Sequence, residues 1–253
     1  NQIMHNGFEL SRIFNIDSGI AKHKDISKLN RFYNYKIEKY IRAYVSKFLN
    51  NYNYYNEKNV TFDSEFFKLK DKCYLSGYWQ SEKYFANHVD LIRNQFKFKI
   101  FLSSQNSIIA DTIKKTSNTI SLHIRRGDYL STVEARSVHY VCNLDYYKRA
   151  MREIETKIIN PTYFIFSDDI EWTKKNIKIK KNHHYIDHNN SIESYNDMRL
   201  MSLCDHHIIA NSSFSWWGAW LNPKIDKIVI APKKWFANGL DCTTHVPENW
   251  LRI

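Results

Sequence analysis

The chain has 253 residues, of which 43% are hydrophobic and 25% charged, as is usual for a globular protein large enough to bury a core. No run of about 18 apolar residues occurs, so the sequence predicts no membrane-spanning helix. The net charge is +11, but the lysines are spread over many segments without interleaved aromatic residues, and we predict no nucleic-acid partner. The four cysteines form no C-x-x-C pair, which argues against a zinc site or a disulfide framework and favours a reducing cytoplasm.

The first 116 residues show a mixed pattern. In order, the spacing of apolar residues predicts a helix over 33–49, a loop over 50–59, strands at 60–67 and 73–79, a helix from Ser81 with Phe85, Val89, Ile92 and Phe96 on one face, and a helix over Ser104–Lys115. A polar hinge at 114–118 follows. We place a domain boundary there, with an N-terminal domain at 1–116 and a C-terminal domain at 117–253.

Strands and helices alternate through the C-terminal domain. Strands are predicted at Thr119–Ile124, 163–166, 184–186, 207–210 and 227–231, and helices at 144–158, from Ile170, from Asn190 or Ser191 to Cys204, and at 214–221. This alternation predicts an α/β fold with a mostly parallel sheet. The C-terminal domain therefore resembles a Rossmann-like nucleotide-binding domain.

The most informative motif is His-Ile-Arg-Arg-Gly-Asp-Tyr at 123–129, where the first predicted strand of this domain ends. Ligands of open α/β sheets bind beyond the carboxyl ends of the strands. Arg125 and Arg126 suit a diphosphate there, because a guanidinium offers a planar fork of donors and keeps its charge. Gly127 allows a sharp turn, and Asp128 can orient an arginine or act on a substrate hydroxyl. A solvated charge cluster and an Arg-Gly-Asp adhesion motif are the alternatives.

A second motif, at 205–220, joins a short apolar strand to an amphipathic stretch through Asn211, Ser212 and Ser213. Any of these three residues is a good N-cap. A helix N-terminus with small hydroxyl residues suits an anion, because free N–H groups and the helix dipole both favour negative charge. The alternative is a plain turn before a tryptophan-rich core helix.

Together these segments resemble the bacterial galactoside α-1,2-fucosyltransferases, which form glycosyltransferase family 11. The resemblance rests on motifs at 8–14, 77–85, 123–129, 164–169, 197–217 and 247–250, so it covers nearly the whole chain. It implies a GT-B-like α/β fold, two Rossmann-like domains facing across a cleft, with the sugar nucleotide on the C-terminal domain and the acceptor on the N-terminal one. Family members open with a strand and a Gly-Gly-Leu-Gly-Asn turn. Neither precedes Phe8, so we expect the first strand of the N-terminal domain to be missing.

The implied activity is that of a galactoside 2-alpha-L-fucosyltransferase, an inverting transfer of L-fucose from GDP-β-L-fucose to the 2-hydroxyl of a terminal β-galactose. No Asp-x-Asp motif stands out, so we expect no metal and no other cofactor, with arginine supplying the positive charge. The resemblance makes Arg125 the first choice for the β-phosphate. Arg126 either binds phosphate too or braces the loop through Asp128. His123 either contacts the diphosphate or packs in the core.

Further donor-site residues are assigned by their place after predicted strands. Ser212 and Ser213 supply hydroxyl or backbone donors to phosphate or fucose, and Asn211 either caps the helix or touches the sugar nucleotide. Asp168 and Asp169 follow the second strand of the C-terminal domain. One of them, with Asp168 preferred, reads the adjacent donors of guanine; a helix cap at Asp169 and a metal ligand are the alternatives.

The acceptor hydroxyl needs a general base. Asp128 is preferred over Glu134, and His139 is a further candidate on the same loop. Two alternatives remain open. Asp128 can instead be held in a structural salt bridge to Arg126, and the phosphate of GDP can take the proton itself.

Trp79 and Gln80 are assigned to the acceptor, because aromatic rings stack on sugar faces and an amide binds hydroxyls; a core tryptophan is the alternative. The implied partners are GDP-fucose and a galactose-terminated oligosaccharide or lipid-linked glycan. The basic charge adds attraction to the nucleotide and to an anionic membrane, or serves solubility alone. We expect a cytoplasmic protein, with peripheral association to the inner face of a bacterial membrane as an option. The alternative functions are a fucosyltransferase of another linkage and an inactive glycan- or nucleotide-binding homologue.

Overall fold

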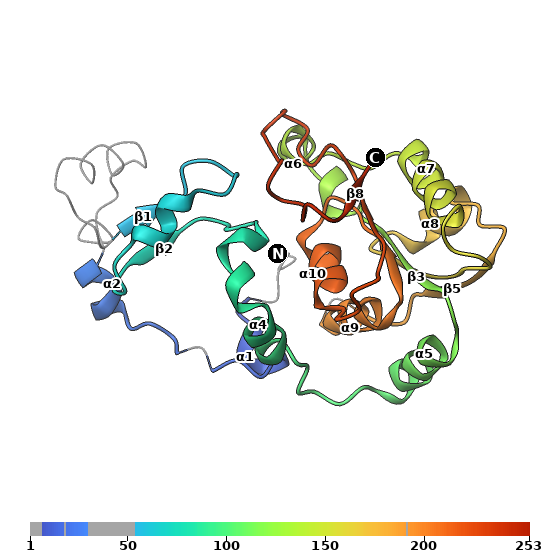
Figure 1. The fold of residues 1–253 in the computed structure, drawn as a ribbon, viewed down its shortest axis with the longest axis horizontal. Coiled ribbons are helices and arrows are strands. Elements are labelled where there is room, and N and C mark those ends of the chain that lie inside the picture. The colour runs from blue at the N-terminus through green and yellow to red at the C-terminus, as the bar shows by residue number, and fades with distance from the viewer. Residues whose placement is uncertain (1–6, 18, 30–53, 191) are drawn as a thin grey trace.

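The structure is a computed structural model that describes residues 7–17, 19–29, 54–190 and 192–253 (Figure 1). Small elements of the N-terminal part lie on the left of Figure 1, and a sheet covered by helices lies on the right. The predicted helix over 33–49 and the first residues of the predicted loop over 50–59 lie outside the described residues.

The C-terminal part is built on one six-stranded sheet in which all neighbouring strands run parallel. Its strands are β3 (Thr119–Ile124), β4 (Thr162–Ser167), β5 (Asn182–Ile186), β6 (His206–Ile208), β7 (Val229–Ala231) and β8 (Leu251–Arg252). The spatial order is β5-β4-β3-β6-β7-β8. Counted from β3 this is 3-2-1-4-5-6, the order of the doubly wound Rossmann fold. The predicted α/β class with a parallel sheet is confirmed, although the pattern does not predict the two-residue edge strand β8.

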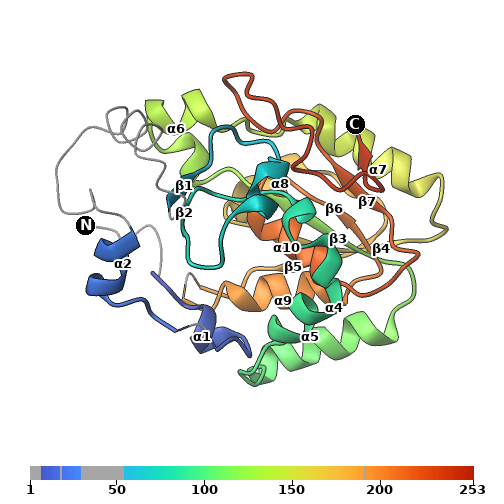
Figure 2. The same ribbon diagram turned by 60° about the vertical axis from the view of Figure 1, so that its left-hand side comes forward.

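Helices cover both faces of this sheet (Figure 2). They are α5 (Ser104–Lys115), α7 (Leu144–Glu155), α8 (Ile170–Asn176), α9 (Tyr195–Leu203) and α10 (Ser213–Leu221). The short helix α6 (Val133–Val138) follows the arginine loop and has no buried residue. The bounds of α5 agree with the predicted helix. The helix expected to begin at Asn190 or Ser191 begins at Tyr195 instead, because the Asn190 side chain caps a separate turn by accepting the N–H groups of Ile192 and Glu193.

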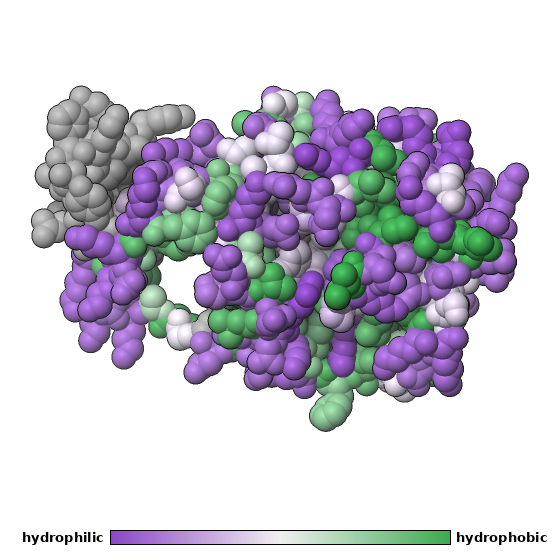
Figure 3. Space-filling view, in the orientation of Figure 1, coloured by the Kyte–Doolittle hydropathy of each residue, from purple (hydrophilic) through white to green (hydrophobic). Residues whose placement is uncertain are grey.

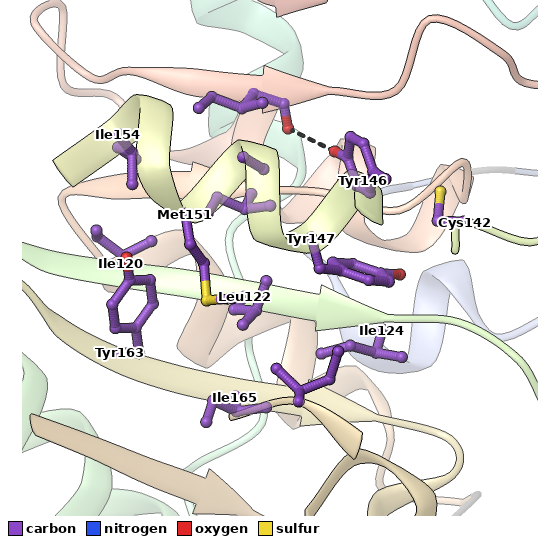
Figure 4. Packing of buried hydrophobic residues seen from close by; sticks show 14 residues of the cluster. Ile120, Leu122, Ile124, Cys142, Tyr146, Tyr147, Met151, Ile154, Tyr163 and Ile165 are labelled. Carbon is purple, nitrogen blue, oxygen red and sulfur yellow. Dashed lines mark hydrogen bonds between the residues drawn. The ribbon is translucent and has the colours of Figure 1, made fainter. Parts of the chain in front are cut away.

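The central strand β3 is buried on both faces. Ile120, Leu122 and Ile124 are fully buried and meet Tyr147 and Met151 of α7 (Figure 4). Burying each such aliphatic side chain contributes about 1.5–3 kcal/mol. The residues between them point to the opposite face, because side chains alternate along a strand. The buried strand therefore gives a rigid support to the arginines that follow it.

The opposite face is covered by α5, α9 and α10. Ala110 and Ile113 of α5 pack in one cluster with Phe164 and Phe166 of β4 and with Leu200 of α9. This packing attaches α5 to the C-terminal sheet. The domain boundary near residue 116 stays a prediction.

The described N-terminal part contains α1 (Leu10–Ile13), α2 (His23–Leu29), β1 (Tyr54–Asn56), β2 (Tyr74–Ser76) and α4 (Val89–Gln95). β1 and β2 form a two-stranded parallel sheet, so the predicted loop is wrong at 54–56. The predicted strand at 60–67 is also wrong. Asp63 accepts the N–H of Glu65 at 3.0 Å and starts a 3-10 helix at Ser64–Lys68.

The helix predicted from Ser81 is broken into two 3-10 turns, Glu82–Tyr84 and Ala86–His88, followed by α4. Its apolar face nevertheless forms, because Phe85, Val89 and Ile92 pack against the tryptophan cluster of α10. Within the described ranges, every helix is too short or too polar to cross a bilayer. On the face drawn in Figure 3, hydrophilic residues predominate and hydrophobic residues gather in separate groups.

Candidate active site at the switch point of the sheet

The two sequence motifs meet where the strand order reverses. β3 ends at Ile124, and β6 ends at Ile208 and leads to Ser213, the first residue of α10. β3 and β6 are neighbours in the sheet and run parallel, so their carboxyl ends lie at the same edge. Doubly wound folds bind nucleotides at this position, with phosphate at a helix N-terminus.

Arg125 lies between two carboxylates at this edge. Its Nη2 donates to Asp128 Oδ2 at 2.7 Å, and its Nε lies 3.2 Å from Asp168 Oδ2. Burial alone would lower the pKa of Arg125, but the charges of Asp168 and Asp128 outweigh burial and raise it above its ordinary value. The guanidinium therefore stays charged. The alternative salt bridge from Asp128 to Arg126 is wrong, because Asp128 pairs with Arg125.

Asp168 fastens the loop that carries the arginines. Its Oδ1 accepts the Arg126 N–H at 2.9 Å, and its Oδ2 accepts the Gly127 N–H at 3.0 Å. A Cβ at residue 127 would lie 3.0 Å from that Oδ2, so the close approach favours glycine. Burial raises the pKa of the Asp168 carboxyl, and Arg125 together with these N–H groups opposes the rise. Asp168 thus braces the arginine loop with both oxygens. Its role at guanine stays a prediction.

Arg126 is anchored to α8. Its guanidinium carbon lies 3.5 Å from the ring centroid of Trp172, and its Nε lies 3.6 Å from Asp169 Oδ2. Asp169 also accepts the Trp172 N–H at 3.2 Å and so caps α8, which is the alternative that the sequence left open. A cation over an indole face is stabilised by roughly 0.5–2 kcal/mol. The two arginines are therefore held by different carboxylates.

Four buried side-chain atoms at this edge lack a hydrogen-bond partner: His123 Nδ1, Arg125 Nε, Arg126 Nε and Asp128 Oδ1. They are four of the nine such atoms in the described part of the chain, although Arg125 Nε and Arg126 Nε keep their ion-pair contacts. Buried polar groups are normally satisfied, so this concentration indicates a site that a ligand completes. Burial, helped by the charge of Arg125, lowers the pKa of His123 to about 3 and keeps its ring neutral.

The N-terminus of α10 forms the second side of the edge. Ser212 is its N-cap and accepts the Phe214 N–H at 3.3 Å, while Ser213 is exposed in the first turn. N–H groups of a first turn have no partner within the helix and suit an anion. Asn211 is buried and donates to the Trp235 carbonyl at 2.9 Å, so it tethers a neighbouring loop and is not the cap.

Tyr129 joins the arginine loop to the α10 side. Its hydroxyl donates to the Asn211 carbonyl at 3.0 Å, and the Arg125 guanidinium lies 5.6 Å from its ring centroid. The Tyr129 ring also stacks on the ring of His139, with 4.3 Å between the two centroids. Burial raises the pKa of Tyr129 to about 12, so its hydroxyl keeps its proton. The two motifs are thus one connected site.

The candidate general bases lie in different surroundings. Asp128 belongs to the arginine cluster, Glu134 is exposed in the first turn of α6, and His139 is stacked on Tyr129. Among the described residues, no group of three or more histidine, cysteine or acidic side chains is arranged to hold a metal ion.

The predicted acceptor residues lie on the N-terminal part. Trp79 is half-buried, and its ring centroid lies within 6 Å of the rings of Tyr55, Phe66 and Tyr84. This packing is that of the core tryptophan which the sequence left as the alternative. Gln80 follows it and is also half-buried.

A Rossmann sheet with arginines and a helix N-terminus at its switch point is the arrangement of an enzyme that binds a phosphorylated nucleotide. The family model of glycosyl transferase family 11 matches residues 17–252, and the chain belongs to this family.

Known relatives agree with this membership. The chain is 36% identical over 259 residues to an alpha-1,2-colitosyltransferase of Escherichia coli, covering 100% of this chain and 85% of the relative. It is 35% identical over 208 residues to the O-antigen biosynthesis glycosyltransferase WbnK of Escherichia coli, covering 78% and 68%. A galactoside alpha-(1,2)-fucosyltransferase 1 of Saimiri boliviensis boliviensis is 25% identical over 154 residues, covering 58% and 42%.

Among solved structures, NodZ alpha-1,6-fucosyltransferase soaked with GDP-fucose aligns with a TM-score of 0.36 and 17% identity, over 53% of this chain and 46% of that one.

Sequence reasoning missed two residues of the site, Tyr129 and Trp172. Both are aromatic: Trp172 holds Arg126, and Tyr129 contacts Arg125 and connects the two motifs. Tyr129 stands inside the recognised motif, so the aromatic residue beside an arginine pair was an available signal. Trp172 comes from another helix, and nothing in its local sequence indicates the contact.

Proposed function

We propose that this protein transfers L-fucose from GDP-β-L-fucose to the 2-hydroxyl of a terminal β-galactose, with inversion and without a metal ion. Membership of family 11 supports glycosyl transfer, and a GDP-sugar donor accords with the relatives. The observation that carries the proposal is the pair of guanidinium groups, Arg125 and Arg126, held at the Rossmann switch point beside the unpartnered buried atoms His123 Nδ1 and Asp128 Oδ1.

The leaving group of this transfer is GDP, so negative charge develops on the diphosphate. Fixed donors aimed at developing charge are usually the largest catalytic contribution. In the proposed complex, Arg125 and the first-turn N–H groups of α10 bind the diphosphate, with Ser212 and Ser213 beside them. Asp168 and Trp172 keep the two arginines in place, so that little reorganisation is needed when the charge appears.

We assign the general base to Asp128. Its Oδ1 is buried and unpartnered, and its Oδ2 is bonded to Arg125. An incoming diphosphate competes for the same guanidinium and so frees the second oxygen. Loading of the donor would thereby prepare the carboxylate that takes the acceptor proton.

A second candidate donor is colitose, which is L-fucose without its 3-hydroxyl, carried on the same nucleotide. The relative that aligns over all of this chain is named a colitosyltransferase, and this favours the second donor. Both donors would use the same arginine site, and they differ only at the sugar. Transfer of fucose in a different linkage, and binding of a glycan or nucleotide without catalysis, are the two remaining candidate functions.

The wider setting is part of the proposal. The N-terminal residues would form the second, acceptor-side domain of a GT-B-like pair, with the boundary near residue 116. We place the protein in the bacterial cytoplasm, where GDP-sugars are used, with its excess positive charge available for an anionic inner membrane surface that presents lipid-linked glycans.

The test is an assay of GDP release with lactose as acceptor and EDTA present. GDP-fucose and GDP-colitose are compared as donors, and NMR identifies the linkage of the product. Lactose-dependent release with fucose on the galactose 2-hydroxyl is the expected result. Faster transfer from GDP-colitose would make colitose, instead of fucose, the sugar that is transferred. Turnover that EDTA abolishes would overturn the metal-free mechanism.

A further inference from the structure

A cleft of about 680 Å³ lies where the small sheet ends, and its lining includes no residue of the arginine cluster. One wall is formed by residues 56–61 and 76–78, and the other by Leu240 and Asp241. Small-molecule sites typically measure about 300–1,000 Å³, so this cleft has the size of a ligand site. In Figure 1 the cyan loop after β1 extends from the N-terminal part on the side of the dark red C-terminal loop.

The position of the cleft follows from the topology. Asn56 and Ser76 are the last residues of β1 and β2 and lie opposite each other in the parallel register. Both carboxyl ends therefore open on the cleft. This is the edge of a parallel sheet at which ligands bind, as at β3 and β6 in the larger sheet.

The turn after β2 is shaped by a close contact with Glu57. The Glu57 carboxylate accepts the N–H groups of Tyr78 at 2.7 Å and Trp79 at 3.1 Å. A Cβ at Gly77 would lie 2.4 Å from the Cβ of Glu57, so only glycine fits there. Trp79 adopts a φ of +51°, which is uncommon for a bulky residue. Strain of this kind is retained mostly at functional sites.

The strained turn separates the roles of two neighbouring aromatic residues. Trp79 is turned into the aromatic cluster with Phe66 and Tyr84, whereas Tyr78 lines the cleft with 81% of its surface exposed. An exposed aromatic ring on a fixed backbone is a suitable stacking partner for the apolar face of a sugar. The fixed turn also reduces the entropy cost of binding.

The charge of the lining defines the ligand further. Glu57 and Asp241 carry negative charge and Lys58 positive charge, so the eleven lining residues sum to −1 in a chain of +11. The remaining polar residues are asparagine, threonine, serine and tyrosine. Such a lining offers hydrogen bonds to hydroxyl groups and repels anions.

The far wall of the cleft is attached to the arginine site. Ala237 donates to the Val138 carbonyl at 2.8 Å, and Phe236 forms a β-bridge with His139. His139 in turn stacks on Tyr129 of the arginine loop. On the other side, the Phe62 N–H donates to Thr244 Oγ1 at 2.8 Å. The loop that bears Leu240 and Asp241 thus connects both regions.

We propose that this cleft binds the acceptor glycan as a neutral sugar chain, with Tyr78 stacked on one ring and with the carboxylates of Glu57 and Asp241 excluding acidic sugars. The inference rests on the proposed function for the direction of transfer. It moves acceptor recognition from Trp79 to Tyr78 and assigns a selectivity for uncharged glycans.

The test titrates the full chain with lactose and with 3′-sulfated lactose by ligand-observed NMR, and with GDP by calorimetry. Tyr78→Ala should weaken lactose binding roughly tenfold through the lost ring contact and leave GDP affinity unchanged. Phe101→Ala is the matched control, because Phe101 is 94% exposed and lies outside the lining. Asp241→Asn keeps an oxygen for the Thr243 N–H and should narrow the preference for lactose over its sulfated form.

Absence of lactose binding to the unmodified chain, or equal lactose affinity in Tyr78→Ala and Phe101→Ala, would overturn the cleft assignment. An unchanged preference in Asp241→Asn would overturn the charge selectivity. Lactose binding that depends on Tyr78 in a chain that binds no GDP would support the glycan cleft and reject the proposed transfer, so the two failures are distinct.

Discussion

The carboxyl ends of the two parallel sheets are built in opposite ways. At the end of β3, Arg125 and Arg126 are only 27% and 18% exposed and each is held by carboxylates or an aromatic ring. At the end of β2, Tyr78 is 81% exposed and only the backbone around it is fixed. Charges interact strongly when they are withdrawn from water, whereas a neutral sugar needs an accessible ring and hydrogen-bonding groups. The difference is that expected between a site for a diphosphate and a site for a glycan.

Removing Arg125 should have the largest effect on the diphosphate site at the end of β3. Arg125→Ala deletes the guanidinium and leaves the Asp128 and Asp168 carboxylates without their cation. We expect GDP binding to be lost and kcat/KM to fall about 10³-fold or more, since loss of a single stabilising donor costs about 10²–10³-fold. Calorimetry with GDP and steady-state kinetics measure the two losses.

Arg149→Ala is the control for that substitution. Arg149 lies exposed on α7 and pairs only with Asp145 at 2.8 Å among its charged neighbours in the described structure. Its loss should leave GDP binding and turnover unchanged. Equal GDP affinity in the two variants would show that the diphosphate binds elsewhere.

Asp128→Asn distinguishes GDP binding from catalysis at the same arginine cluster. Without the carboxylate, Arg125 is freer to meet a diphosphate, and we expect GDP to bind about fivefold more tightly, as loss of one competing ion pair allows. Turnover should fall about 10²-fold, because a general base contributes about 10²–10⁴-fold. Weaker GDP binding would mean that Asp128 positions Arg125 for the donor. Tighter binding with full turnover would remove Asp128 from the base role.

Local sequence patterns predicted much of the larger sheet, because its strands and helices follow apolar periodicity. β3 and α5 were predicted with their actual bounds. In the N-terminal part, capping by Asp63 and strand pairing across 54–76 overrode the local pattern. Periodicity cannot detect such contacts, since they depend on a side chain or a partner strand elsewhere in the chain.

The sequence predicted which residues belong to the candidate site, but it did not predict which side chains contact them. The motif located Arg125 and Arg126 at a strand end, where the structure also has them. The partners of Arg126 came from α8 and from the turn after β4, 40 or more residues away, so the sequence did not indicate the contacts of Asp168 and Trp172. The ion pair of Asp128 goes to Arg125, three residues away, instead of Arg126. The sequence assigned Trp79 to the acceptor. The left-handed backbone of Trp79, which turns its ring into the aromatic cluster while Tyr78 stays exposed, has no signature in the sequence.

Asp197 tests the complementary case, a carboxylate that is withdrawn from water without a cation beside it. Its carboxyl is half-buried in the first turn of α9 and accepts the Asn189 side-chain N–H at 2.6 Å, with no cation paired to it in the described structure. Burial raises its pKa from 3.8 to about 7. Between these values the unfolded chain has released the proton and the folded chain keeps it, so this carboxyl lowers stability as pH rises through that window.

Asp197→Asn removes the ionisable group and retains an oxygen for Asn189. We expect the variant to gain on the order of 2 kcal/mol in stability at pH 8, or about 4–8 °C in Tm, and nothing below pH 4. Thermal unfolding across that range measures the difference. Asp145→Asn, on the exposed face of α7, should show no such pH-dependent gain. A gain that is the same at both pH values would trace the effect to packing instead of charge.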